Sequence, residues 1–526
     1  MQVFKNAAFI SCEDNNRLFT HLVEDGGHIV FTGDGLPEPY RHADPVDLKG
    51  ACVLPAFGDT HMHFESFAYF HAGLDCRHVR DFEELGDLIR NYSTGRGGRE
   101  KVIVGFGCSA HTVKERRLPT RKDLDAVTTH PLILVKYDGH AAVGNSALIR
   151  RLPGAALQKD EGFDTESGWF HLNSFYRAIN HITKSVSIPR VFNNMIGGSR
   201  YLARHGIALV HTTEGVGFPL DLDVDIMRFT SRGLPQTFRT FFQTMDVAKV
   251  LRRKLPRIGG CFATALDGCF GSEDAALLQP YSNRSDNRGT LFYSQQQTTD
   301  FVTIANRNGL QVALHAIGDA AIEQALTAFE SALGDFPRED HRHIIIHADL
   351  MNPAMIEKAA RLGVCIALQA PFLHWEQEPV SYLQEILGDR INHLIPLKTM
   401  LQHGLTMAGG SDAPCTLPDP IAGIHAACNH PNPDESISVL DALRLHTGCC
   451  ARLSFDERQR GTLSDGKVAD LVVLDQNPLE IPTSRLKDMK IKALYLKGRA
   501  YEPGRGGALS LLADSIANRY PQSVSH

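Results

Sequence analysis

The 526-residue sequence has little of what directs a chain to a membrane or to nucleic acid. No apolar run is long and uninterrupted enough to cross a bilayer, which takes about 20 consecutive apolar residues. Basic residues are not in excess, since 54 Lys and Arg stand against 60 Asp and Glu, and the formal net charge is −6. No basic cluster departs from this balance. We therefore expect neither a membrane nor a nucleic acid as a partner.

Two further absences indicate the chemical state of the cysteines. The first residues, MQVFKNAAFISCEDNN, lack the charged-then-apolar layout of a secretion signal. We therefore expect a cytoplasmic location, where the 11 cysteines would be reduced thiols rather than disulfides. No two cysteines have the Cys-x-x-Cys spacing, which argues against a zinc site built from cysteines.

Apolar runs of strand length recur through the middle of the chain, separated by polar loops and helical patterns. Each is almost continuously apolar, as expected for a strand that is buried on both faces of a parallel sheet. They lie at residues 54–60, 207–210, 237–242, 261–266, 312–314, 343–346, 364–368 and 405–408. Helical patterns such as 320–333 and 353–362 lie between them. Eight such strands predict an α/β protein with a (β/α)8 TIM-like barrel.

Two regions do not follow this alternation. Short strand patterns occur at both ends of the chain, at 7–10, 20–23, 28–32, 469–474 and 491–496. Because chain termini often lie close together, we expect 1–52 and 460–526 to form one small β-sandwich domain beside a barrel of residues 53–459. Residues 66–190 separate the first barrel strand from the second and carry apolar runs of their own. We interpret them as an inserted subdomain that caps the catalytic face.

Residues of metal-binding type stand at the ends of four predicted strands. His61 and His63 end the first strand and point to the same side, because side chains alternate along a strand. His315 ends the fifth strand, His347 the sixth and Asp412 the eighth. Each alone could be structural, as a core histidine or a helix N-cap. Because the strand ends of a barrel meet at one mouth, together they predict a divalent-metal site, and zinc suits neutral imidazole ligands.

A metal site with an open coordination position is typical of hydrolysis. The metal would polarise a substrate carbonyl and lower the pKa of its bound water to about 7, which supplies hydroxide at neutral pH. A carboxylate beside that water can take its proton and return it to a leaving amine. Asp412 is the only acid among the strand-end residues, so we expect it to act as general base and acid as well as ligand.

Motifs in order along nearly the whole chain resemble the amidohydrolase superfamily. They are LPAFGDTHMH at 54–63, DGHAAVGNS at 138–146, DG at 267–268 with GS at 271–272, HAIGDA at 315–320, HADL at 347–350, GSDAP at 410–414 and GKVADLVVL at 466–474. Within the superfamily they are similar to the amidohydrolase-3 or YtcJ-like group related to N-substituted formamide deformylase. The resemblance implies a metal-dependent hydrolase that cleaves a C–N bond of a small molecule, in an amide, a formamide or a cyclic amide. At the level of the family, it also implies a homodimer.

The sequence departs from the family pattern at one position. Many members carry a lysine on the fourth strand that becomes carboxylated and bridges two metals. Ala263 stands where we expect that lysine. We therefore expect one metal ion, and two only if Lys136 serves as the bridge. A salt bridge or a substrate contact is the preferred role of Lys136.

Three more residues are candidates for contact with the substrate. His140, in the insert, is expected to reach the substrate or its oxyanion, unless it only fixes the turn at Asp138 and Gly139. His211 follows the second predicted strand and Gln369 follows the seventh, so both are expected to line the pocket.

Two other functions stay open from the sequence. A deaminase of an amino-heterocycle usually keeps a glutamate just after the fifth-strand histidine, and here Asp319 stands four residues after His315. The third function is a non-catalytic barrel that only binds a ligand. Loss of the predicted metal ligands would favour it, but all five are present.

Overall fold

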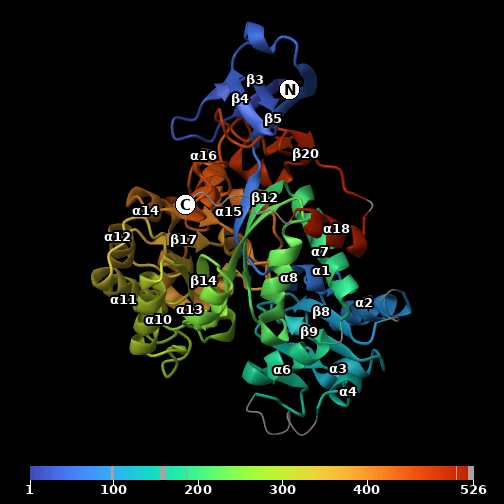
Figure 1. The fold of residues 1–526 in the computed structure, drawn as a ribbon. Coiled ribbons are helices and arrows are strands. Elements are labelled where there is room, and N and C mark those ends of the chain that lie inside the picture. Colours follow the sequence, from blue (N-terminus) through green and yellow to red (C-terminus); the bar gives the residue numbers. More distant parts are fainter. Residues whose placement is uncertain (96, 98–99, 154–161, 185, 505, 519–526) are drawn as a thin grey trace.

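The structure, a computed structural model, describes residues 1–95, 97, 100–153, 162–184, 186–504 and 506–518 (Figure 1). A barrel occupies the middle of the molecule, with a β-sheet built from both ends of the chain on one side and an inserted α/β segment on another (Figure 1). Residues 519–526 of the predicted terminal domain and 154–161 of the predicted insert lie outside the described residues.

Eight parallel strands form the central sheet, and each overlaps one of the eight strands predicted from the sequence. In sheet order they are β6 (Phe57–Met62), β12 (Ile207–Glu214), β13 (Thr237–Phe242), β14 (Arg257–Ala265), β15 (Gln311–Ala316), β16 (Ile344–His347), β17 (Cys365–Leu368) and β18 (Met407–Gly409). The hydroxyl of Thr60 donates to the carbonyl oxygens of Ala408 and Gly409, which brings the two outer strands together. The predicted (β/α)8 TIM-like fold is confirmed.

Helices pack around this sheet. They are α1 (Phe64–His71), α7 (Ile188–Arg204), α8 (Leu222–Thr230), α9 (Val247–Arg252), α10 (Gln295–Arg307), α11 (Asp319–Asp335), α12 (Pro353–Leu362), α13 (Val380–Leu387), α14 (Leu397–Gln402), α15 (Pro420–Cys428), α16 (Val439–Leu445) and α17 (Gly448–Leu453). Local sequence sets their limits: Asn352 caps α12 by accepting from Met355 N, and Gly363 ends it at φ 71°. Among the described residues, no helix has both the length and the apolar character that a bilayer span requires.

Both ends of the chain enter one sheet. Its strands are β1 (Gln2–Ile10), β2 (Leu18–Phe19), β3 (His21–Asp25), β4 (His28–Gly33), β5 (Asp44–Pro55), β19 (Leu471–Leu474), β20 (Ile491–Leu496) and β21 (Arg499–Ala500). β5 connects the two ends, since it pairs in parallel with β1 and antiparallel with β19. β5 crosses the predicted boundary at residue 52, and α18 (Ala508–Ala517) packs on α7 and α8 of the barrel. The sandwich and its boundaries stay predictions.

The segment between β6 and β12 contains a second, five-stranded sheet. Its elements are β7 (Leu74–Asp75), β8 (Ile103–Cys108), β9 (Leu132–Lys136), β10 (Ala141–Gly144), β11 (Trp169–His171), α2 (Phe82–Thr94), α3 (Arg121–Asp125), α4 (Ser146–Ile149) and α6 (Leu172–Thr183). Phe106 and Val135 of this sheet join one apolar cluster with Trp375 and Cys415, which follow β17 and β18. The insert therefore packs against loops at the carboxyl ends of barrel strands, as a cap would.

An ion pair with one buried partner joins β13 to the segment after α17. Arg239 donates from Nε and Nη2 to the two carboxylate oxygens of Asp456, at 2.7 and 2.5 Å. The hydroxyl of Ser454 donates to the same carboxylate at 2.7 Å. Burial alone would raise the pKa of Asp456, but the hydrogen bond from Arg239 holds it below its usual value.

We predict that Asp456→Ala lowers the free energy of unfolding by about 2–3 kcal/mol, because it leaves the Arg239 guanidinium without its partner. Chemical denaturation at pH 7 measures this loss. Since the folded-state pKa is lowered, the carboxylate stabilises the protein above its unfolded pKa of about 3.9, and the difference from wild type should shrink as the pH falls below that value. Asp286→Asn, at a side chain that is 82% exposed, is the control and should change nothing measurable. Equal stability of Asp456→Ala and wild type at pH 7 would contradict the prediction.

Candidate metal centre

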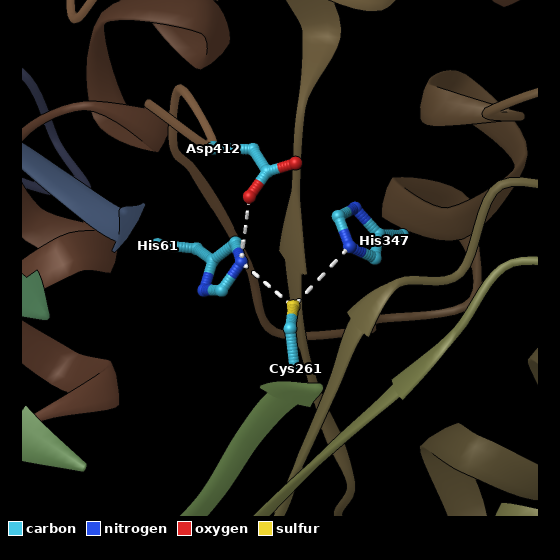
Figure 2. A group of neighbouring side chains, drawn as sticks. All are labelled: His61, Cys261, His347 and Asp412. Atoms are coloured by element: carbon cyan, nitrogen blue, oxygen red, sulfur yellow. Dashed lines mark hydrogen bonds and ion pairs between the residues drawn. The ribbon is translucent and has the colours of Figure 1, made fainter. Parts of the chain in front are cut away.

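Four buried side chains converge at the mouth of the barrel (Figure 2). They are His61 on β6, Cys261 on β14, His347 on β16 and Asp412 in the loop after β18. Their nearest donor atoms all lie within 4.8 Å of one another. Nε2 of His61 lies 3.0 Å from Asp412 Oδ1 and 3.1 Å from Cys261 Sγ, which in turn lies 3.7 Å from His347 Nε2.

This donor set fits one divalent cation. Zinc binds imidazole nitrogen, thiolate sulfur and carboxylate oxygen at about 2.0–2.3 Å, so two ligands of one ion lie within about 4.5 Å of each other. The three distances given above already lie within this value, so small side-chain movements would arrange the four donors around one ion. Nδ1 of His61 is buried without a hydrogen-bond partner, and Nε2 of the same ring faces the other donors.

Backbone hydrogen bonds hold the donor-bearing loops together. Asp412 N donates to the His61 carbonyl oxygen, and His63 N donates to the Ala413 carbonyl oxygen, both at 2.8 Å. His347 and Asp412 have positive φ angles of 71° and 54°. Such angles are uncommon outside glycine and often occur at functional sites.

Two polar side chains orient the histidines. Gln369 Oε1 lies 2.5 Å from His347 Nδ1, and Gln369 Nε2 donates to the Ala367 carbonyl oxygen. With its Nδ1 hydrogen committed to Gln369, His347 presents Nε2 to the cluster as an acceptor. The hydroxyl of Thr213 lies 3.0 Å from His63 Nδ1 and gives that ring a fixed partner as well.

The electrostatics favour neutral imidazoles beside a charged carboxylate. Burial lowers the pKa of His61, and it lowers the pKa of His347 to about 4. Burial would raise the pKa of Asp412, but the hydrogen bonds with His61 and His63 hold it well below its usual value. Burial, together with Asp412, raises the pKa of the Cys261 thiol well above its usual value, and a bound cation would bring it to the thiolate form. Neutral imidazole and ionised carboxylate are the states in which these groups bind metals.

The other two predicted ligands lie beside the four-residue group. His63 Nε2 is 3.5 Å from Asp412 Oδ1. His315 lies next to His347, with ring centroids 4.5 Å apart, but its Nε2 lies 3.2 Å from the carbonyl oxygen of Gly268 and its Nδ1 has no partner. Thus three of the five predicted ligands belong to the group, and the other two adjoin it.

Cys261 is the member of the group that the sequence did not predict. Gly260 pairs with Leu314 and Ala265 pairs with His315, so residues 261–264 bulge out of the ladder between β14 and β15. Ala263, where we expected the family's lysine, is not part of the group, and Cys261 enters it from within the bulge. The absence of Cys-x-x-Cys excluded only a paired-cysteine site, because a single cysteine can join histidines and a carboxylate.

Lys136 and His140 lie in the insert, near the same cavity. Lys136 Nζ lies 2.7 Å from Asp138 Oδ2 and donates to the Ser272 hydroxyl at 3.0 Å, so it has the salt bridge that we preferred over a metal bridge. His140 lines the cavity, and its backbone N donates to Asp138 Oδ1 at 3.1 Å. Both roles considered for His140 are therefore compatible with its position.

Two residues that we expected to line the pocket do not line this cavity. His211 is buried, and within the described part of the chain neither of its ring nitrogens has a hydrogen-bond partner. It does not line the cavity beside the candidate metal centre. The reason is that β12 continues three residues further, so Thr213 rather than His211 reaches the mouth on that face. Gln369 does not line the cavity either, since both ends of its amide bond to protein groups.

Asp319 does not occupy the position that a deaminase would need. Its Oδ1 accepts from Leu278 N at 2.8 Å, at the start of α11, and it is not among the residues that line the cavity. Asp319 therefore does not reach the cavity in which a ring nitrogen would be protonated.

The fold and the donor group together define a metal-dependent barrel enzyme. The sequence profile of the amidohydrolase family matches residues 44–168 and 244–501. The chain belongs to the amidohydrolase family, as the sequence motifs indicated.

Several similar proteins align with nearly the whole chain. The YtcJ protein of Bacillus subtilis (strain 168) is 26% identical over 93% of this chain and 96% of its own length. N-substituted formamide deformylase of Arthrobacter pascens is 24% identical over 94% of this chain and 96% of its own length. Among solved structures, an uncharacterized metal-dependent hydrolase from Pyrococcus furiosus is 25% identical and has a TM-score of 0.73, covering 91% of this chain and 100% of that one.

The contact between Gln369 and His347 predicts that Gln369→Leu weakens metal binding by about 10–100-fold, because the His347 ring loses the acceptor that orients it. Gln369→Glu keeps an acceptor oxygen and should bind metal nearly as well as wild type. Competition with a chromophoric chelator measures the affinities. Gln384→Leu, at an exposed position on α13, is the matched control. Wild-type affinity in Gln369→Leu would show that this contact does not support the site.

Proposed function

We propose that this chain hydrolyses the C–N bond of an amide, a formamide or a cyclic amide in a small molecule, in the cytoplasm and with one zinc ion. The convergence of His61, Cys261, His347 and Asp412 beside a cavity is the observation that carries the proposal. A relative that aligns over nearly the whole chain and is named N-substituted formamide deformylase supports formamides among the candidate substrates.

The same four side chains would hold the metal ion. When bound, a divalent cation polarises the substrate carbonyl and lowers the pKa of a water molecule near it. Two imidazoles, one thiolate and one carboxylate are a donor set that suits zinc. One ion is proposed because Lys136, the candidate bridge, is engaged by Asp138 and lies outside the donor group.

Asp412 is the group that moves the proton. Its carboxylate takes a proton from the attacking water as the water oxygen bonds to the carbonyl carbon. It then gives the proton to the amine nitrogen as the C–N bond breaks. His140 would hold the carbonyl oxygen, and its position in the cavity wall supports this role.

The insert and the loops around the mouth enclose the reacting groups. Much of the cavity wall is aromatic, including Phe70, Phe106, Phe175, Tyr176 and Phe262. An apolar wall excludes water other than the nucleophile and strengthens the electrostatic contacts inside. It also fits a substrate that carries an apolar group on one side of the scissile bond.

A metal-removal experiment tests this function. We expect chelator-treated protein to lose hydrolysis of N-formyl and N-acyl amines and to regain it with Zn²⁺. Asp412→Asn should lower kcat by about 100-fold or more, because the amide cannot accept the proton. Asp286→Asn should retain wild-type kcat, since that side chain is exposed.

Three results would contradict the proposal. Ammonia release from aminopyrimidines or aminopurines, without amide cleavage, would identify a deaminase. Purified protein without metal and without the capacity to bind it would indicate a binding protein. Amide hydrolysis that is unchanged in Asp412→Asn would remove that residue from the mechanism.

A further inference from the structure

The cavity beside the metal centre contains a buried acid that the proposed reaction does not use. Asp349 follows β16 two residues after His347, lines the cavity and is only 3% exposed. Its Oδ1 is buried and has no hydrogen-bond partner among the residues that the structure describes. A backbone bond from Ile395 N to the Asp349 carbonyl oxygen, 2.7 Å long, holds the residue in place.

The acids in the cavity wall differ in whether a positively charged group lies beside them. Asp138 has Lys136 at 2.7 Å, and Asp412 belongs to the proposed metal centre. Glu378 Oε2 accepts from the Tyr137 hydroxyl at 3.0 Å, but within the described part of the chain no cation forms an ion pair with it. Asp349 likewise has no ion-pair partner there. These two acids are therefore the ones without a cation of their own.

The metal centre would not supply the missing charge. A zinc ion carries two positive charges, and the Cys261 thiolate and the Asp412 carboxylate carry one negative charge each. The occupied centre is therefore neutral overall, and Asp349 stays uncompensated. A buried carboxyl oxygen without a hydrogen-bond partner is costly, so a ligand that brings N–H donors to it would be favoured at this place.

Aromatic rings line the same cavity. Phe372 and Trp375 stack with centroids 4.8 Å apart, and both line the cavity together with Asp349 and Glu378. The faces of such rings attract organic cations. Buried acids and stacked aromatic rings in one cavity are a combination that suits a protonated amine.

We propose that Asp349 and Glu378, with Phe372 and Trp375, form a subsite for a protonated amine of the substrate. The amine donates N–H hydrogen bonds to the Asp349 carboxylate and lies near the aromatic rings. This inference narrows the substrate class of the proposed hydrolysis. It rests on that proposed function only for which bond of the substrate is cleaved. The preferred substrate is then an amide or formamide that carries a second, cationic amino group.

The test compares two probes of nearly equal shape on the zinc-loaded, full-length protein. Benzylamine is a cation at pH 7 and benzyl alcohol is neutral. Calorimetry should show that benzylamine binds at least about tenfold more tightly than benzyl alcohol. In Asp349→Asn this ratio should fall to about twofold or less, while Asp286→Asn keeps it and the zinc content stays the same in all three proteins.

The substrate preference is measured with two formamides of equal chain length. Mono-N-formyl-1,4-diaminobutane should have a kcat/KM at least about tenfold above that of N-formylbutylamine, and Asp349→Asn should remove the difference. If neither is cleaved but benzylamine still binds through Asp349, the proposed function fails and the subsite stands. If both are cleaved equally well and wild type does not prefer benzylamine, the subsite fails alone.

Two further results would count against the amine subsite. A preference for benzylamine that survives in Asp349→Asn would mean that the amine binds elsewhere, for example on the metal, and would overturn the inference. If Asp349→Asn does not fold, Glu378→Gln takes its place and should reduce the ratio of the two affinities. An unchanged ratio in that variant would count against the subsite.

Discussion

The proposed metal centre depends on how the last barrel strand returns to the first. Two backbone hydrogen bonds, from Asp412 N to the His61 carbonyl oxygen and from His63 N to the Ala413 carbonyl oxygen, bind the loop after β18 to β6. They place the Asp412 carboxylate against both histidines, more than 300 residues away in the sequence. The contacts that close the barrel therefore also bring the residues of the site together.

The rest of the site is arranged around this junction. β16 brings His347, whose ring is oriented by Gln369 from the neighbouring strand β17. β14 brings Cys261 through a bulge, a local irregularity that often re-aims a side chain next to an active site. The insert packs on the loops after β17 and β18 and adds apolar walls to the cavity. The barrel thereby carries a cavity whose walls come largely from the insert and the loops.

Much of the fold and part of the site could be predicted from the sequence. The eight barrel strands are continuously apolar because both of their faces are buried, and this pattern is visible without the structure. His61, His347 and Asp412 were found because each follows an apolar run. Cys261 was missed because it lies in a bulge of β14 that the sequence pattern does not reveal.

The positions of His211 and Gln369 also differ from what the sequence suggested, for similar reasons. His211 was placed at the mouth because the apolar run ends there, yet β12 continues through polar residues to Glu214. Gln369 was assigned to the substrate because it follows a predicted strand. In the structure its partner is His347 on the neighbouring strand β16, and no local sequence pattern encodes this contact. The unpartnered carboxylate of Asp349 is likewise visible only when the cavity is known.

X-ray absorption at the zinc edge of the purified, zinc-loaded protein tests the central claim most directly, because it reports the atoms bound to the metal. A centre formed by His61, Cys261, His347 and Asp412 predicts one sulfur at about 2.3 Å together with nitrogen and oxygen at about 2.0–2.2 Å. Cys261→Ser should lose the sulfur contribution and keep the others. A wild-type spectrum with only nitrogen and oxygen around zinc would contradict the account.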